Sequence, residues 1–169
     1  MTKQSRQDLL HALERFSGRR CIGFSAGEGT GSVVNFEFEP RRPRQRPLTN
    51  PNLTEEQRAG DSEYGLFVEC AWRLDGPQEV VCGAWDDNSP RGPMLRGLQG
   101  IVGHKAEFFR LSEPGLDLEI LFGNGWTLRV FCDQVNEEDE GDNYSVFCPG
   151  EILVVGTKSR LRRENHEGS

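Results

Sequence analysis

Two neighbouring carboxylates, Asp86 and Asp87, follow a predicted strand end in the sequence Trp-Asp-Asp-Asn-Ser. Loops at strand ends often carry binding groups. Among the three histidines, only His104 falls where it could lie near the core sheet. Asp86, Asp87 and His104 are therefore the candidate ligand-binding residues. The alternative is that the carboxylates only form a turn, since Asp and Asn are common turn formers.

No spacing in the chain predicts a catalytic residue or a cofactor. The short nucleophile signatures are absent, and no histidine can be paired with a serine or cysteine from spacing alone. The glycine-rich residues 27–31 do not fit a phosphate-binding loop, because they join two strand patterns and Glu28 would repel phosphate. They predict a hairpin loop instead.

The cysteines do not predict a metal site or a disulfide framework. There are five, an odd number, and none forms a Cys-x-x-Cys pair. Cys70, Cys132 and Cys148 fall on the apolar faces of predicted strands, where a thiol behaves as a small buried hydrophobic group. The acidic residues 136–142 lack the ligand pattern of a calcium loop and predict a solvated hairpin tip.

A basic, proline-rich run is the clearest candidate interaction surface. It contains Arg41, Arg42, Arg44 and Arg46. Such a run could meet nucleic acid or an acidic partner. Aromatic residues for base stacking are not interleaved with the arginines, which disfavours nucleic acid. The acidic loop at 136–142 could also neutralise the run, within one chain or between two.

The composition predicts one acidic domain. The chain has 169 residues and a net charge of −7, and it is long enough to bury a core without a metal or disulfide. No apolar run approaches the roughly 18 residues of a membrane span. The first seven residues are polar, with no apolar signal region behind them. We therefore expect a cytoplasmic protein that does not bind membranes.

Periodic apolar residues predict a mainly β fold: an antiparallel curled sheet or partly open barrel of about eight strands, with one N-terminal helix at residues 6–17. An α+β fold with the helix packed on an antiparallel sheet is the alternative. We expect one domain over residues 1–157. Within it, residues 40–62 form an excursion outside the sheet, with a helical turn near 53–58 capped by Asn52. Residues 158–169 form a polar, frayed tail.

The hairpin at residues 116–132 has a register that can be argued. A three-residue loop at 123–125 sets Ile120 against Leu128 and Glu119 against Arg129, so that one face is apolar and opposite charges pair on the other. A two-residue turn would mix the faces. The same alternation predicts that Trp72 and Trp126 are buried and that Cys70 is reduced beside Trp72.

Part of the chain resembles a group of small uncharacterised bacterial domains. The resemblance covers roughly the last hundred residues, in the Cys-Ala-Trp-Arg-Leu strand at 70–74 and the Asp-Leu-Glu-Ile-Leu-Phe and Leu-Arg-Val-Phe hairpin at 117–131. The group has no established activity to carry over. Its members often look like accessory genes on mobile elements or beside toxin genes.

The function expected from these observations is non-catalytic: a binding or protein-interaction domain, in the manner of an immunity-like accessory protein. The alternative is a small-molecule-binding protein or enzyme with a site in the concave face of the sheet. We also expect a homodimer, because sheet edges need protection. Phe67 and Phe131 point away from the apolar face and could join the arginines in an interface.

Overall fold

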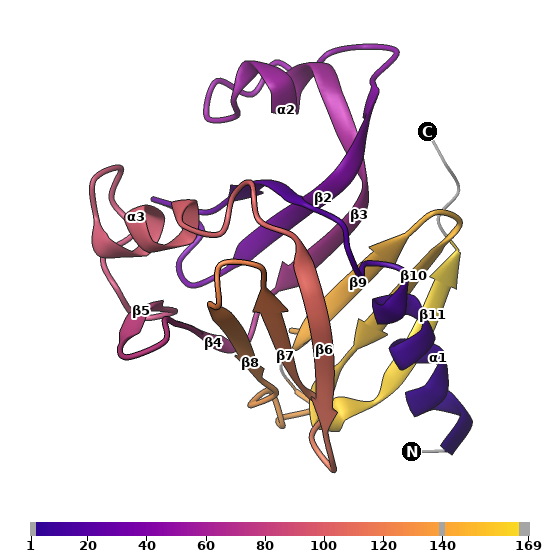
Figure 1. Cartoon of the computed structure of the whole chain (residues 1–169). Coiled ribbons are helices and arrows are strands. Elements are labelled where there is room, and N and C mark those ends of the chain that lie inside the picture. Colours follow the sequence, from indigo (N-terminus) through magenta and orange to yellow (C-terminus); the bar gives the residue numbers. More distant parts are fainter. Residues whose placement is uncertain (1–2, 139–140, 166–169) are drawn as a thin grey trace.

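The chain folds into two antiparallel sheets, in a computed structural model that describes residues 3–138 and 141–165 (Figure 1). One sheet has six strands in the order β1-β2-β3-β9-β10-β11, and the other has five in the order β5-β4-β8-β7-β6. The first contains β1 (Cys21–Ser25), β2 (Val34–Pro43), β3 (Gly60–Val68), β9 (Tyr144–Cys148), β10 (Glu151–Val155) and β11 (Leu161–Asn165). The second contains β4 (Ala71–Asp75), β5 (Val80–Gly83), β6 (Ala106–Ser112), β7 (Asp117–Phe122) and β8 (Thr127–Phe131).

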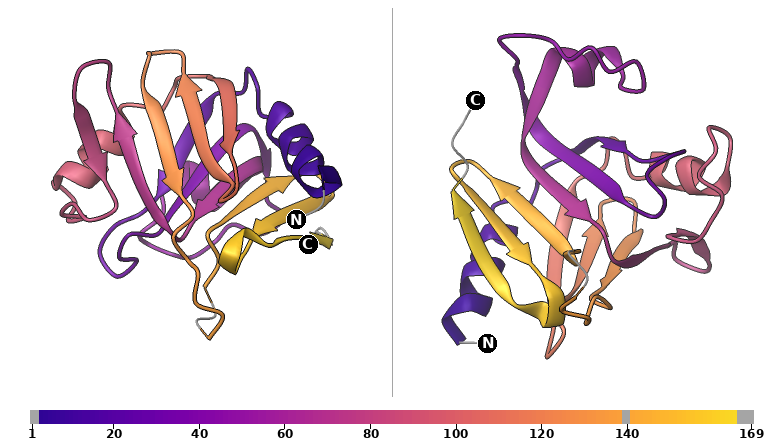
Figure 2. Two further views of the ribbon diagram at one scale, coloured as in Figure 1. Left: turned by 90° about the horizontal axis from the view of Figure 1, so that it is seen from below. Right: turned by 180° about the vertical axis from the view of Figure 1, so that it is seen from behind.

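The sheets curl around a shared core without closing into a barrel, which confirms the predicted mainly β fold (Figure 2). A single bridge between Arg20 and Lys105 connects the sheets beside the β1 edge. Helix α1 (Lys3–Glu14) packs against β6 and β9. Behind it, Phe16 makes edge-to-face contacts with Phe38 and Tyr64 at ring-centroid distances of 5.2 and 5.3 Å. The predicted amphipathic helix is present, but it begins and ends three residues earlier than expected.

The predicted excursion at residues 40–62 was wrong at both ends. β2 continues to Pro43 and β3 begins at Gly60, so Arg41 pairs with Ser62 and Arg42 with Asp61. A register shift between Phe38 and Arg41 accommodates Pro40, because a bulge does not need the missing N–H donor. Only residues 44–59 leave the sheet, and they contain α2 (Glu55–Ala59), which Thr54 rather than Asn52 caps.

The predicted frayed tail was also wrong over its first half. Leu161–Asn165 forms β11 and pairs along its whole length with β10. Arg162, which projects from this edge strand, binds the carboxylate of Asp142 through two nitrogens, one of them at 2.7 Å. Residues 166–169 lie outside the described residues. A 3-10 turn at Thr157–Ser159 connects β10 to this strand.

The predicted hairpin register is confirmed. Glu119 lies opposite Arg129 and forms an ion pair with it, and Ile120 lies opposite Leu128. The N–H of Gly125 donates to the Phe122 carbonyl at 2.8 Å and closes the three-residue loop, where the φ of Gly125 is +82°. A positive φ of this kind favours glycine.

The burial predictions for the tryptophans were half right. Trp72 is 2% exposed, and Cys70, two residues before it, is buried and not in a disulfide. Trp126 is only partly buried, because it precedes β8 and packs at the rim of the sheet. Its ring lies against Gly100, at the end of helix α3 (Pro93–Gln99), where a side chain on residue 100 would collide with it.

Asn143 lies where the chain passes between the sheets and is fully buried. Its carbonyl accepts hydrogen bonds from the N–H groups of Glu69 and Cys70, at 3.0 and 3.1 Å, on the passage from β3 to β4. Its side-chain oxygen accepts from the Gln134 N–H at 3.0 Å, on the return passage from β8 to β9. Its side-chain nitrogen donates to the Gly156 carbonyl at 2.8 Å. Asn143 therefore bonds to both of the chain segments that connect the two sheets.

Replacing Trp72 by Ala should lower the free energy of unfolding by about 3–5 kcal/mol, because the buried ring leaves a cavity. Urea unfolding followed by circular dichroism measures this change. Trp85→Ala is the control, since Trp85 is 89% exposed and its loss should change stability by less than about 0.5 kcal/mol. Equal effects of the two substitutions would contradict the assignment of the core face of β4.

Replacing Asn143 by Ala should lower the free energy of unfolding by about 2–4 kcal/mol, because the Gln134 N–H and the Gly156 carbonyl lose their partner. The matched control is Asn136→Ala, which removes an exposed side chain. A stability loss no larger for Asn143→Ala than for Asn136→Ala would show that the side chain does not hold the return passage in place.

Candidate functional site

The outward face of the six-stranded sheet carries a large hollow in the described part of the chain. Along β3, Leu66 and Val68 point into the core, and Gly65 and Phe67 point outward. Gly65 lies between Glu37 of β2 and Phe147 of β9 in the cross-strand register. Gly65 is buried, and a Cβ atom at this position would lie 3.6 Å from the Phe147 ring, so the ring packs beside the glycine.

We call this hollow the arginine groove. Its volume is about 810 Å³. Its floor comes from three strands, one wall from the chain that follows β2, and the other wall from the β9–β10 turn. The lining residues are Asn35, Arg42, Pro43, Arg44, Gln45, Arg46, Asp61, Ser62, Glu63, Gly65, Phe147, Cys148 and Pro149.

Three arginines form the wall of the groove, and they differ in their partners. Arg42 forms an ion pair with Glu63, and Arg44 binds Asp61 at 2.9 Å. The Arg44 side chain also donates to the Gly60 carbonyl at 3.2 Å. Arg46 is exposed and makes no hydrogen bond or ion pair with any described residue. Three arginines against two carboxylates leave one positive charge in excess in the groove of an acidic chain.

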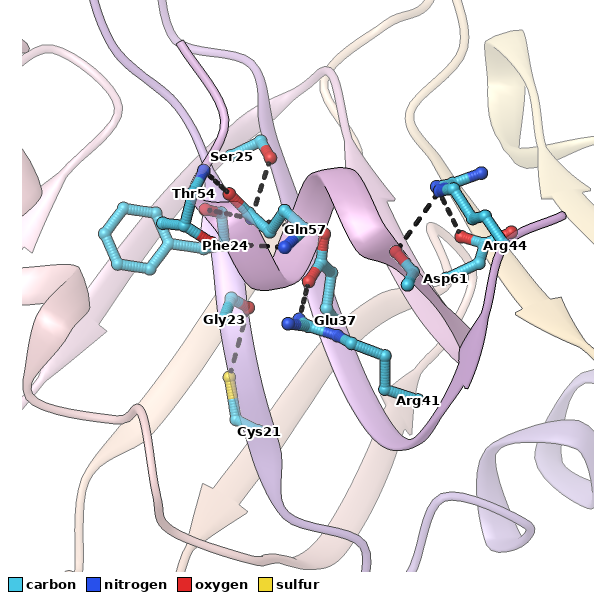
Figure 3. A network of polar contacts seen from close by, with 11 residues as sticks. Cys21, Gly23, Phe24, Ser25, Glu37, Arg41, Arg44, Thr54, Gln57 and Asp61 are labelled. Carbon is cyan, nitrogen blue, oxygen red and sulfur yellow. Dashed lines mark hydrogen bonds and ion pairs between the residues drawn. The ribbon is translucent and has the colours of Figure 1, made fainter. Parts of the chain in front are cut away.

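A buried polar network holds this wall against the sheet (Figure 3). The side-chain nitrogen of Gln57 on α2 donates to the Phe24 carbonyl at 3.1 Å, to the Ser25 hydroxyl at 3.3 Å and to Glu37 at 3.2 Å. The other carboxylate oxygen of Glu37 accepts from Arg41. Gln57 therefore anchors α2 to β1 and β2. The N–H groups of Arg44 and Leu48 donate to the Ala59 and Arg58 carbonyls, and these bonds tie the wall to the anchored helix.

A smaller hollow of about 300 Å³ lies beside this network. Arg41 and Gln57 line it together with Phe24 and Val102. The Arg41 guanidinium already forms an ion pair with Glu37, and Glu56 adds a second carboxylate to the lining of this hollow. The carboxylates outnumber the single cation here, so this hollow does not offer an anion-binding site.

Thiol chemistry in the arginine groove is disfavoured. Cys148 is the one cysteine that lines the groove. Burial raises the pKa of its thiol to about 11, so the thiol is protonated at neutral pH and is a weak nucleophile. The groove lining contains no histidine that could act as its base. The arrangement is therefore suited to binding through charge and shape.

The structure does not place Asp86, Asp87 or His104 in either hollow. Asp86 accepts a hydrogen bond from the Gly83 N–H at 2.8 Å, and Asp87 accepts from the N–H and hydroxyl of Ser89 at 2.9 Å each. Those two bonds hold the pKa of Asp87 below its usual value. Both carboxylates shape the loop after β5, as turn formers do. His104 is exposed on the loop before β6.

The two candidate aromatic residues do not form one patch. Phe67 points outward from the six-stranded sheet, next to Asn35 and Ser145 on the neighbouring strands. Phe131 is 37% exposed on the five-stranded sheet, with the Arg73 guanidinium 5.7 Å from its ring centre. Of the predicted interaction residues, the structure brings Arg42, Arg44 and Arg46 together in the groove, and Arg41 braces it from behind.

In the described part of the acidic loop, no carboxylate forms an ion pair with the arginine run. Glu137 binds Lys158 at 3.2 Å and Arg160 at 2.7 Å, and Asp142 binds Arg162. These basic partners come from the C-terminal segment that follows β10. Asp139 and Glu140 lie outside the described residues. The homodimer stays a prediction, and two of the described carboxylates of this loop, Glu137 and Asp142, already have partners within the chain.

Sequence reasoning missed the floor of the groove. Gly65 and Phe147 are far apart in the sequence, and they meet only because β3 pairs with β9. Asp61 and Glu63 were also missed, although their alternation with Ser62 is typical of a strand with an acidic outer face. The exposure of Trp85 was also missed, because Trp85 follows the apolar residues of a predicted strand and was expected to continue that strand.

Comparison with known proteins gives no relative for this chain. No protein family matches it, and neither the curated proteins nor the solved structures contain a significant match. Within residues 3–138 and 141–165, no helix is long and apolar enough to cross a membrane. The described residues also contain no cluster of three or more histidine, cysteine or acidic side chains that could hold a metal ion. The site must therefore be interpreted from its own geometry.

Replacing Gln57 by Ala should release residues 44–59 from the sheet while leaving the core folded, because three hydrogen bonds of one buried side chain are lost. We expect amide hydrogen exchange in this segment to become about 10- to 100-fold faster. Gln45→Ala is the control, since Gln45 is exposed at the groove. Unchanged exchange in residues 44–59 would contradict the bracing role of Gln57.

Proposed function

We propose that the protein is a non-catalytic interaction domain that holds an extended, acidic segment of another protein in the arginine groove. The observation that carries this proposal is Arg46, an exposed arginine without a partner among the described residues, in a hollow that already contains Arg42 and Arg44. Arginine clusters bind carboxylates through paired, charge-assisted hydrogen bonds.

The existing ion pairs do not prevent this binding. In each pair one side chain is exposed, Arg42 at 74% and Asp61 at 62%, and its partner is less exposed, Glu63 at 17% and Arg44 at 28%. The exposed Asp61 is the carboxylate that a ligand can replace at small cost, because solvent-exposed ion pairs contribute only about 0–1 kcal/mol. Arg46 needs no such exchange and would be the first contact of the incoming segment.

The floor of the groove supports an extended chain as the ligand. Gly65 adds no side chain to the floor, and the partly buried Phe147 ring beside it offers an apolar surface. A strand-like segment presents side chains alternately to two sides. Acidic side chains could therefore face the arginine wall while apolar ones contact Phe147.

The net charge of the protein determines where on its surface an acidic segment can bind. The chain carries −7 overall and repels acidic proteins at long range. The arginine groove is a local region of excess positive charge, so an acidic segment should bind there in preference to the rest of the surface. The effect should weaken as salt screens the charges.

Fluorescence anisotropy with two labelled peptides of equal length tests the proposal. One peptide alternates glutamate with apolar residues, and the other has lysine in place of glutamate. We expect binding of the acidic peptide only, weakened about 10- to 100-fold by Arg46→Glu. Arg110→Glu is the matched control, because Arg110 is an exposed arginine on β6 of the other sheet.

Two results would contradict the proposal: equal binding of both peptides, or the same loss of affinity for Arg46→Glu and Arg110→Glu. A third variant, Gly65→Leu, tests the floor of the groove without changing any charge. It should also weaken binding, because its side chain would occupy the space beside Phe147.

A further inference from the structure

Cys70 and Cys132 lie on the two passages that connect the sheets. Cys70 immediately precedes β4, and Cys132 immediately follows β8. These strands pair with Ala71 opposite Phe131 and Trp72 opposite Val130. Continuing the register by one residue places Cys70 opposite Cys132, on the same face as Trp72 and Val130.

The backbone between these two cysteines has the geometry of a non-hydrogen-bonded pair. The Cys70 N–H donates to the Asn143 carbonyl at 3.1 Å, and the Cys132 N–H donates to the Asp117 side chain at 2.7 Å. Residues in such pairs have Cα atoms about 4.5 Å apart and closely approaching side chains. Disulfides span Cα distances of about 4.4–6.8 Å, and the spacing of a non-hydrogen-bonded pair falls within this range.

The two thiols also interact. A hydrogen bond with the Cys132 side chain, together with burial, raises the pKa of the Cys70 thiol. Cys70 is 2% exposed, whereas Cys132 is partly exposed to solvent. A dissolved oxidant would therefore reach Cys132 first.

The other three cysteines offer no comparable pair. The thiol of Cys21 donates to the Gly23 carbonyl and that of Cys148 to the Ala12 carbonyl. Cys82 packs against Gly97 of α3. These cysteines are buried, and none of their described contacts involves a second thiol.

We propose that Cys70 and Cys132 form a reversible disulfide on exposure to a peroxide, and that the bond links the two passages between the sheets. The Cys132 thiolate attacks one peroxide oxygen, the O–O bond breaks, and Cys132 becomes a sulfenic acid as the leaving oxygen takes a proton to form water. The Cys70 sulfur then attacks the Cys132 sulfur, and the sulfenic hydroxyl leaves as a second water. The two thiols lose two electrons, which reduce one hydrogen peroxide to two waters.

Peroxide treatment of the full chain, followed by digestion without reductant and mass spectrometry, tests the disulfide. We expect one linked peptide containing Cys70 and Cys132, two fewer thiols in a titration of the denatured protein, and recovery of both with dithiothreitol. The rate should rise with pH, because the thiolate is the attacking species. The oxidised protein should melt at a higher temperature, since the bond constrains the unfolded chain.

Two variants separate this pair from general oxidation. Cys132→Ala should abolish the linked peptide, whereas Cys82→Ala should leave it unchanged, although each removes one thiol. Oxidation of Cys132 to a sulfinic acid without a link to Cys70 would overturn the proposal. Links between separate molecules, or links that involve other cysteines, would overturn it as well.

Discussion

The architecture depends on how the chain crosses twice between two sheets without leaving buried polar groups unsatisfied. Asn143 meets this constraint at both crossings. Its carbonyl accepts hydrogen bonds from the segment between β3 and β4, and its side chain bonds to the segment between β8 and β9 and to Gly156. Buried polar groups without partners cost about 1–3 kcal/mol each. The hydroxyl of Tyr144, the next residue, donates to the Leu116 carbonyl at 2.9 Å and adds a second buried link between the sheets. With the crossings fixed, β3 lies beside β9, and that pairing forms the floor of the arginine groove.

The elements predictable from the sequence were those with strict local alternation. The hairpin register followed from the alternation around Ile120 and Leu128 and from the opposite charges of Glu119 and Arg129. β11 was not predicted, because its residues are mostly charged. It is an edge strand that pairs only with β10, and ion pairs such as Arg162 with Asp142 stabilise it further. The ends of β2 and β3 escaped because the prolines that disfavour a central strand are tolerated at a bulge and a strand end.

The site could be predicted only in part, for a physical reason. The arginines form one local run, so their role as interaction residues could be proposed from spacing. Gly65 and Phe147 become neighbours only through a long-range strand pairing, and no local pattern carries that information. The bracing by Gln57 was equally hidden, because a buried glutamine is defined by its partners on β1 and β2 rather than by its own position in a helix.

The arginine groove combines an anchored wall with a floor that lacks a side chain at Gly65. Residues 44–59 are anchored by a buried polar network at Gln57, so the backbone that carries Arg44 and Arg46 is held beside the sheet. Preorganised groups lose less entropy on binding, and most of their interaction energy is then available to the complex. The groove therefore has the properties expected of a selective surface for acidic segments, on a protein whose remaining charge repels them.

The most direct test is a titration of the isotope-labelled protein with the acidic peptide, followed by nuclear magnetic resonance of the backbone amides. The account predicts that the shifted signals cluster around Arg44, Arg46, Gly65 and Phe147 on the outward face of the six-stranded sheet. Shifts confined to the loop after β5 around Trp85, or to the face of the five-stranded sheet around Phe131, would contradict it.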